Sequence, residues 1–177
     1  QEQCGYTAHH PRWAVAYKFQ AKQATSVLLQ VDFQIGKIGS ITPVAKIEPV
    51  QLAGVTVSSI SLHNEDFIRT KDIFLRDTVL VERAGDVIPY IVKSFSELRG
   101  TDATPIVFPS VCPDCKTKLV REEDEAAWRC PNFHCPSQVI QRLIHHVSKD
   151  AMNIDGLGAS LIERFYELGW IKNMADI

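Results

Sequence analysis

Apolar and polar residues alternate through much of the stretch from 25 to 95, and this pattern predicts strands. Runs rich in β-branched and aromatic residues are separated there by turn-forming residues, as expected for a sheet with one buried face. Five such runs occur: TSVLLQVDFQI (25–35), SITPVAKIE (40–48), GVTVSSISL (54–62), TVLVERA (78–84) and DVIPYIVKSF (86–95). This part of the chain is therefore predicted to be mainly β.

One short helix is expected between the third and fourth strands. The segment HNEDFIRTKDIF (63–74) is charged and amphipathic, and Asn64 is a residue type that caps helix N-termini. Five strands with a helix at this point match the Greek-key barrel of the oligonucleotide-binding (OB) fold. An unrelated five-stranded barrel would give much the same pattern, so the residues alone leave that alternative open.

Beyond residue 95 the pattern changes twice. The segment SELRGTDATPIVFPS (96–110) is rich in turn formers and has no period, which predicts a linker. SQVIQRLIHHVSK (137–149) and GASLIERFYELGW (158–170) then place apolar residues at helical spacing, so each predicts a helix. The residues that set this spacing are Val139, Leu143 and Val147 in the first run and Leu161, Phe165 and Leu168 in the second.

Four of the five cysteines lie in two short motifs, Cys112-Pro-Asp-Cys115 and Cys130-Pro-Asn-Phe-His-Cys135. Each motif can aim two thiolates at one tetrahedral zinc ion, and four thiolates leave no position for water. The spacing therefore predicts a structural Zn²⁺ site. His134 is an alternative ligand, although its neighbour Cys135 makes it hard for both to reach one metal. Cys4 is given no function, and the acidic run 122–125 between the motifs is expected to be the solvated tip of a strand-turn-strand.

The sequence MNIDGLG (152–158) connects the two predicted helices and has the form of a helix-hairpin-helix turn. Gly156 and Gly158 would let the chain turn tightly and bring backbone N–H groups against a DNA phosphate, next to a helix N-terminus. A plain helical connector that contains glycine is the alternative interpretation.

Charge and hydropathy argue against a uniformly basic nucleic-acid-binding protein and against a membrane protein. A formal net charge of -2 at pH 7 excludes a uniformly basic surface, so nucleic-acid contacts must come from local clusters of Lys and Arg. No apolar run approaches the roughly 20 residues that a membrane span requires, and the first residues lack the form of a signal peptide. The protein is therefore expected to be soluble and intracellular, without a membrane partner.

The segment PRWAVAYKF (11–19) is mostly apolar and predicts a buried strand. A lysine within such a strand, here Lys18, needs an anion to compensate for the desolvation of its ammonium group. A lysine that extends to solvent from a strand edge is the alternative.

Taken in order, these motifs resemble those of bacterial NAD-dependent DNA ligases: PRWAVAYKF, ITPVAKIEPV (41–50), LHN (62–64), RAGDVIP (83–89), the four-cysteine module and MNIDGLG. The resemblance covers essentially the whole chain. It implies the end of an adenylating domain in 1–22, an OB-fold domain in 23–100, a Cys4 zinc finger in 101–137 and the start of a helix-hairpin-helix domain in 138–177. It also implies a monomeric bacterial protein of the cytoplasm and nucleoid.

The resemblance implies an activity with NAD and Mg²⁺. In this family a lysine attacks the α-phosphate of NAD and releases nicotinamide mononucleotide. The AMP then moves to the 5′-phosphate of a nick, and the 3′-hydroxyl displaces it. That lysine lies in a Lys-x-Asp-Gly motif, which occurs nowhere in the 177 residues. The chain alone is therefore expected to be inactive.

The resemblance also implies roles for single residues. Lys18 matches a lysine that contacts the nucleotide phosphate, and Arg12 matches an arginine that contacts the nicked strand. Lys37-Ile38 stands where the family commonly has Arg-Thr, which keeps a positive charge but loses the two-pronged geometry of arginine. The remaining positions matched to the DNA-facing surface of the barrel are Arg83, Val87 and Ile88, next to the turn-prone Ala84-Gly85-Asp86.

A protein of a different class stays open as an alternative. A freestanding DNA-binding adaptor could combine a barrel and a zinc ribbon without enzymatic activity. The segment Arg12 to Phe19 argues against it, because an adaptor has no need of a strand that contacts a nucleotide.

Overall fold

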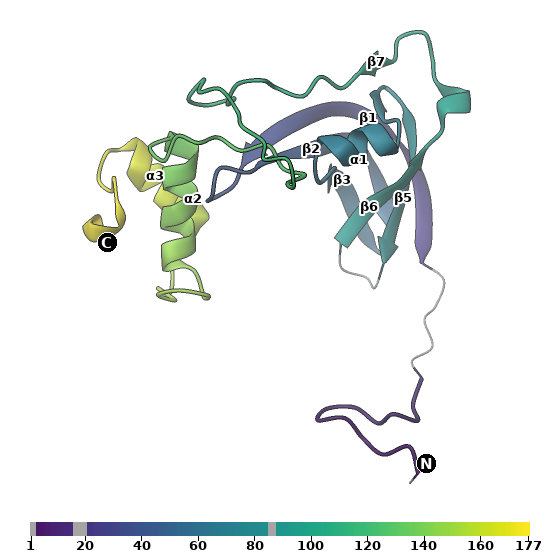
Figure 1. Cartoon of the computed structure of the whole chain (residues 1–177), viewed down its shortest axis with the longest axis horizontal. Helices are drawn as coiled ribbons and strands as arrows, with labels where there is room; N and C mark the ends of the chain where they lie inside the picture. The colour runs from purple at the N-terminus through teal and green to yellow at the C-terminus, as the bar shows by residue number, and fades with distance from the viewer. Residues whose placement is uncertain (1–2, 16–20, 85–87) are drawn as a thin grey trace.

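A curled five-stranded antiparallel sheet forms the centre of the molecule (Figure 1). The computed structural model describes residues 3–15, 21–84 and 88–177. Its strands follow the order β3-β2-β1-β5-β6 across the sheet. The strands are β1 (Lys22–Ile35), β2 (Ile41–Leu52), β3 (Val55–Ser61), β5 (Thr78–Ala84) and β6 (Ile88–Ser94).

Strand β1 is long because it pairs with two different neighbours. Its first part, Lys22 to Val27, pairs with β5, and a bulge between Leu28 and Gln30 accompanies the change to β2. Such irregularities bend a strand and increase its twist, which curls the sheet. The edge strands β3 and β6 approach each other, so the sheet is a partly open barrel. This confirms the predicted fold class, mainly β with an OB-type barrel.

Helix α1 (Glu65–Thr70) lies between β3 and β5, as predicted. The side chain of Asn64 accepts a hydrogen bond from the Phe67 N–H at 2.8 Å, which is the expected N-cap. Ile68 points from this helix into the barrel core. The buried residues of that hydrophobic core are all aliphatic: Leu28, Ala45, Ile47, Leu52, Val57, Ile60, Leu62, Ile68, Ile73, Val79, Val81 and Ile91.

The segment 96–110 is not the free linker that its composition predicted. After a short 3-10 helix, η1 (Ser96–Leu98), strand β7 (Thr104–Pro105) pairs with β4 (Phe74–Leu75). The guanidinium of Arg99 binds the fully buried carboxylate of Asp77, with Nε to Oδ1 at 2.8 Å. Such long-range contacts leave no local periodicity, and for this reason the pattern did not reveal them.

Helices α2 (Pro136–Val147) and α3 (Ala159–Glu167) pack together, and a short 3-10 helix, η2 (Met174–Asp176), follows α3. Leu143 and Val147 are buried as their spacing predicted. On α3 the fully buried residue is Ile162, whereas Leu161 and Leu168 are exposed. Phe165 packs against this core as predicted, but the prediction was wrong for Leu161 and Leu168. Leu161 and Ile162 are both apolar, and only packing against α2 decides between them.

The predicted strand at 11–19 is not seen in the part of it that is described. Pro11 forms an isolated bridge with Tyr6, Arg12 and Trp13 lie in a turn, and Val15 is 94% exposed. A strand needs a neighbouring strand for its backbone hydrogen bonds, and the described residues provide none here. Lys18 and Val87 lie outside the described residues.

Candidate metal centre and nucleic-acid interface

The four cysteines of the two motifs converge on one point. One ligand atom from each of Cys112, Cys115, Cys130 and Cys135 lies within 4.8 Å of all the others. Cys112, Cys130 and Cys135 are buried and Cys115 is half-buried, so most of the cluster is shielded from water. His134 does not belong to this group, and its ring packs edge-on against Phe133. The arrangement matches the four-thiolate set that the sequence predicted.

The sulfur separations fit a tetrahedral zinc ion. The Sγ atoms of Cys112 and Cys135 are 3.8 Å apart, and those of Cys115 and Cys130 are 3.5 Å apart. Four sulfurs at the usual Zn–S distance of about 2.3 Å would be separated by about 3.8 Å along each edge of the tetrahedron. With four ligands the coordination is closed, so Zn²⁺ here would stabilise structure and would not activate water.

The backbone around the four cysteines contains little regular secondary structure. Residues 111–135 contain isolated bridges, such as Val111 to Lys118 and Val120 to Arg129, in place of the expected strand-turn-strand. Asp114 accepts hydrogen bonds from both the N–H and the hydroxyl of Ser137, each at 2.8 Å, which ties the first motif to α2. The tip of the acidic run is exposed as expected, but Glu125 is half-buried and pairs with Arg129.

The turn between β1 and β2 is locked to the second cysteine motif. The N–H of Cys130 donates to the carbonyl of Gly39 at 2.9 Å, and Gly39 has a φ of 82°. A Cβ at Gly39 would lie 2.4 Å from the Cys130 carbonyl oxygen. The buried amide of Gln138 donates to the carbonyls of Cys130 and Asn132 at 2.9 and 3.0 Å. Close packing here requires a glycine, so the barrel, the second cysteine motif and α2 are in direct contact at Gly39.

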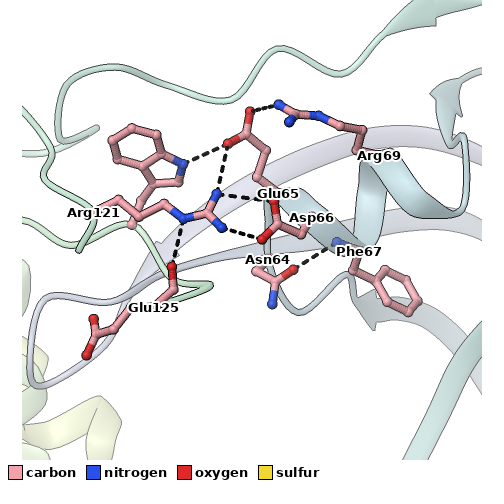
Figure 2. A network of polar contacts seen from close by, with 8 residues as sticks. Asn64, Glu65, Asp66, Phe67, Arg69, Arg121 and Glu125 are labelled. Carbon is pink, nitrogen blue, oxygen red and sulfur yellow. Dashed lines mark hydrogen bonds and ion pairs between the residues drawn. The ribbon is translucent and has the colours of Figure 1, made fainter. Parts of the chain in front are cut away.

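A second connection joins α1 to the zinc module, as Figure 2 shows. The guanidinium of Arg121 forms a two-pronged contact with Asp66, and its Nε donates to the carbonyl of Glu125 at 2.7 Å. The indole N–H of Trp128 donates to Glu65 at 2.8 Å. Hydrogen bonds from Arg121 hold the pKa of Asp66 below its ordinary value, so this carboxylate stays charged at neutral pH.

Sequence reasoning missed these connecting residues. No local sequence pattern links these residues to their partners, which lie in distant segments of the chain. This holds for Gln138, Arg121 and Asp66. Gly39 gave the only available signal, since a glycine at the end of a turn indicates a positive φ or a close approach.

The positions matched to DNA contacts on the barrel fall in two places. Lys37 and Ile38 are exposed in the β1–β2 turn beside the zinc module. Arg83 pairs with Lys22 at the opposite end of β1, where Ile88 begins β6 and is 69% exposed. The Arg83 side chain is half-buried and donates to the carbonyl of Ala53 at 3.4 Å, so it is less exposed than its neighbouring turn suggested.

The remaining positions lie on other elements. Arg12 is exposed in the N-terminal turn. Gly156 has a φ of 76°, which explains the glycine, whereas Gly158 is extended with a φ of −90° and precedes α3. No atom of the described residues would touch a Cβ at Gly158. The hairpin therefore leaves open space in front of the α3 N-terminus.

An open groove of about 800 Å³ separates the barrel from the helices, and its charge is negative. Phe33 and Ile140 contribute apolar surface, and Asp114, Glu163 and Glu167 contribute carboxylates. Because DNA phosphates are repelled by such a surface, the groove is an unfavourable site for DNA.

Comparison with known proteins identifies the modules. Residues 25–103 match the family model described as NAD-dependent DNA ligase OB-fold domain, and residues 111–136 match the NAD-dependent DNA ligase C4 zinc finger domain. The chain is 57% identical over 99% of its length to a DNA ligase of Hydrogenobaculum sp. and covers 25% of that protein.

Two further relatives agree. The chain is 53% identical over 98% of its length to the DNA ligase of Aquifex aeolicus, of which it covers 24%. It is 50% identical over its full length to that of Staphylococcus saprophyticus, of which it covers 26%. The chain thus spans about a quarter of the length of the curated relatives it matches. No helix in the described part of the chain combines the length and apolar character needed to cross a bilayer.

Proposed function

Because the chain belongs to the family of NAD-dependent DNA ligases, we propose that it is the part of such a ligase that holds nicked duplex DNA in position for sealing. The observation that carries this proposal is the order of the matched domains, an OB-fold domain followed at once by a C4 zinc finger. The close contact between Gly39 and Cys130 supports a single rigid surface on which DNA can be held. The relatives named DNA ligase favour this function over a freestanding adaptor.

The chemistry would come from the rest of the ligase. A lysine outside these residues would take AMP from NAD, with Mg²⁺ assisting, and pass it to the 5′-phosphate of the nick. Lys18 would contact the nucleotide phosphate, where charge develops in each transition state. The whole protein would act as a monomer in the bacterial cytoplasm, at the nucleoid. Residues 1–22 would complete the adenylating domain, followed by units at 23–100, 101–137 and 138–177.

The barrel would grip the minor groove on both sides of the nick. Lys37 and Arg83 would pair with phosphates, and Ile38, Val87 and Ile88 would offer apolar surface to the sugars. The exposure of Lys37, Ile38 and Ile88 supports this role. Arg12 would contact the nicked strand.

The hairpin would add a phosphate contact. Gly158 needs no glycine for its own backbone conformation, and the space in front of it is open to a ligand. Backbone N–H groups at the start of α3, together with Gly156 and Gly158, can bind a phosphate there.

Binding of a fluorescent nicked duplex to this chain, measured over a range of salt concentrations, tests the proposal. Arg83→Ala should weaken binding and reduce the slope of log K against log salt by roughly 0.9, as expected when one phosphate contact is lost. Glu123→Lys, at the exposed acidic tip, is the control and should change neither value. Superimposable titrations of Arg83→Ala and the unaltered chain would remove Arg83 from the DNA surface.

Two measurements test the division of labour. The chain incubated with NAD and Mg²⁺ should gain no AMP in its intact mass, because the nucleophile is absent. In the longer ligase, Lys18→Ala should lower nick sealing by on the order of 10²-fold. An AMP adduct on this chain, or sealing by Lys18→Ala at the unaltered rate, would contradict these roles.

A further inference from the structure

The second cysteine motif presents an aromatic side chain to solvent. Phe133 lies between Cys130 and Cys135 and is 66% exposed, although the metal centre behind it is buried. A large apolar ring at the tip of a rigid loop loses free energy in water and gains it on contact with a partner. Phe133 therefore marks a candidate contact surface on the zinc module.

An arginine is held against this ring. The guanidinium carbon of Arg142, on α2, lies 3.9 Å from the centroid of the Phe133 ring. Its Nη2 also donates to the Phe133 carbonyl at 2.6 Å. Two contacts fix the orientation of the guanidinium before any ligand binds, and most of its five N–H donors stay available. An aromatic ring paired with an arginine is a combination that proteins use on nucleic acids.

The surroundings of Phe133 favour a polyanion. The sequence of α2 contains no acidic residue, and it places His145 one helical turn after Arg142, on the same face. The carboxylates of Glu163 and Glu167 lie in the groove instead, with Ser137 and Gln141 of α2. Helix α2 thus separates an acidic groove from a basic face with an exposed ring.

The position of the pair also points to DNA. A chain of hydrogen bonds leads from Gly39 to Cys130, then through Gln138 to Asn132, next to Phe133. Phe133 is therefore close to the turn that carries Lys37 and Ile38. The other end of α2 leads directly into the hairpin with Gly156 and Gly158. Along these contacts, the Phe133–Arg142 pair lies between the turn and the hairpin, the two places at which the proposed function holds DNA.

We propose that Phe133 and Arg142 form a further contact for duplex DNA, in which the ring packs on deoxyribose and the guanidinium binds a phosphate. This inference rests on the proposed function, since it assumes that the barrel and the hairpin hold the same duplex. It assigns to the zinc module a direct part in DNA binding, beyond joining the barrel to the helices.

The test measures the binding of a fluorescent nicked duplex to the zinc-loaded chain as salt is varied. Phe133→Ala should weaken binding by about fivefold to tenfold, because the deoxyribose loses the ring that it packs on. Arg142→Gln should weaken binding and reduce the salt slope by about 0.9, as for one lost phosphate contact. Phe133→Tyr keeps an aromatic ring and should bind more tightly than Phe133→Ala. Arg142→Lys keeps the positive charge and should bind more tightly than Arg142→Gln.

Arg164→Gln is the matched control. Arg164 is also an exposed arginine of the helical hairpin, but its guanidinium pairs with Glu167, which lines the acidic groove. Its loss should leave the salt slope unchanged. Zinc content is measured for every variant, and if Phe133→Ala loses metal, Phe133→Leu replaces it.

The outcomes separate the two proposals. If the unaltered chain binds nicked duplex tightly and the Phe133 and Arg142 variants bind it equally well, this inference alone is overturned. The surface around Phe133 would then contact another partner, such as a protein. Failure of the unaltered chain to bind nicked duplex overturns both. Equal losses of DNA affinity for Arg142→Gln and Arg164→Gln would show that any lost positive charge has this effect. That result would also overturn the proposed Phe133–Arg142 contact.

Discussion

The barrel and the zinc module are stabilised in different ways. The hydrophobic core of the barrel contains twelve buried residues, all of them aliphatic, from its strands, its loops and α1. In the cluster around the cysteines, Leu119 is the one buried aliphatic residue that the module itself supplies, and Ile35 and Ile41 come from the barrel. The remaining buried members are Cys112, Cys130 and Cys135.

This difference shows where each region obtains its stability. Burial of apolar side chains, worth about 25 cal/mol per Å², can stabilise the barrel without a metal. The module buries too little apolar surface for that and contains only isolated bridges between its backbone segments. It therefore depends on zinc and on its contact with the barrel, and the following changes test that dependence.

Loss of zinc should have the largest effect, and it should be confined to one region. Chelation or Cys115→Ser should unfold residues 111–135, because zinc binding in such modules supplies about 10–16 kcal/mol. The barrel strands should keep their protection. Hydrogen exchange followed by peptide distinguishes the two regions, and Cys4→Ser, which alters an exposed cysteine outside the centre, should retain one zinc per chain. Loss of protection in β1–β6 together with the module would contradict a metal-independent barrel.

Removal of the buried charge in the barrel should have the second-largest effect on stability. Asp77 is completely buried and accepts hydrogen bonds from Arg99, Ser94 at 2.6 Å and the Phe74 N–H at 2.9 Å. Asp77→Ala should lower the free energy of unfolding of the barrel by about 3–5 kcal/mol, since Arg99 loses its buried partner. Asp72→Ala removes the exposed partner of Arg99 and should cost much less. Urea unfolding measures both, and equal costs would reject the buried pair as the source.

The carboxylate of Asp77 should also make the stability of the barrel depend on pH in the acidic range. Burial raises the pKa of Asp77, but hydrogen bonds from Arg99, Ser94 and Phe74 outweigh it, and the pKa ends below its ordinary value. The stabilisation is therefore complete above about pH 4, the pKa of an unfolded aspartate, and is lost as pH falls through the lower folded pKa. Asp77→Asn should flatten this part of the profile. An identical acid profile for both proteins would contradict the assignment.

A smaller effect is expected at the junction of the two regions. Gly39→Ala places a Cβ 2.4 Å from the Cys130 carbonyl oxygen at a φ of 82° and should cost about 1–3 kcal/mol. Gly54 has a similar φ of 79° but nothing within 4 Å of a Cβ. Gly54→Ala therefore reports the backbone strain alone. Thermal unfolding of the two variants gives the cost of the clash, and equal shifts in Tm would show that the turn does not press on the zinc motif.

The smallest effect on stability should come from the partly exposed ion pairs of Figure 2. Arg121→Met removes the contact between the zinc module and Asp66, and the Tm should fall slightly at low salt and hardly at all at high salt. Arg69→Met is the control, because Arg69 pairs with Glu65 within α1 and does not cross the junction. A larger, salt-independent loss for Arg121→Met would move the main support of the module from the metal to this pair.

Several features could be predicted from local patterns. Alternation located the five strands, Asn64 marked the start of α1, and the spacing of Cys112 to Cys135 predicted a cluster that the structure brings together. Each of these depends on neighbours within a few residues, since strand period, helix caps and zinc knuckles are short-range rules. The order of the motifs then led to the ligase family, which the matched domains confirm.

The sequence by itself determined the five main strands, three of the helices and the four clustered cysteines, and only the tertiary structure decided how they are joined. Arg99 lies in a segment that resembles a linker, yet it reaches Asp77 because β7 returns to β4. Gly39 and Gln138 meet at Cys130 although almost a hundred residues separate them, and Ile162 rather than Leu161 faces α2. The physical reason is that burial and close packing depend on which surfaces meet in space, and no local period records that choice.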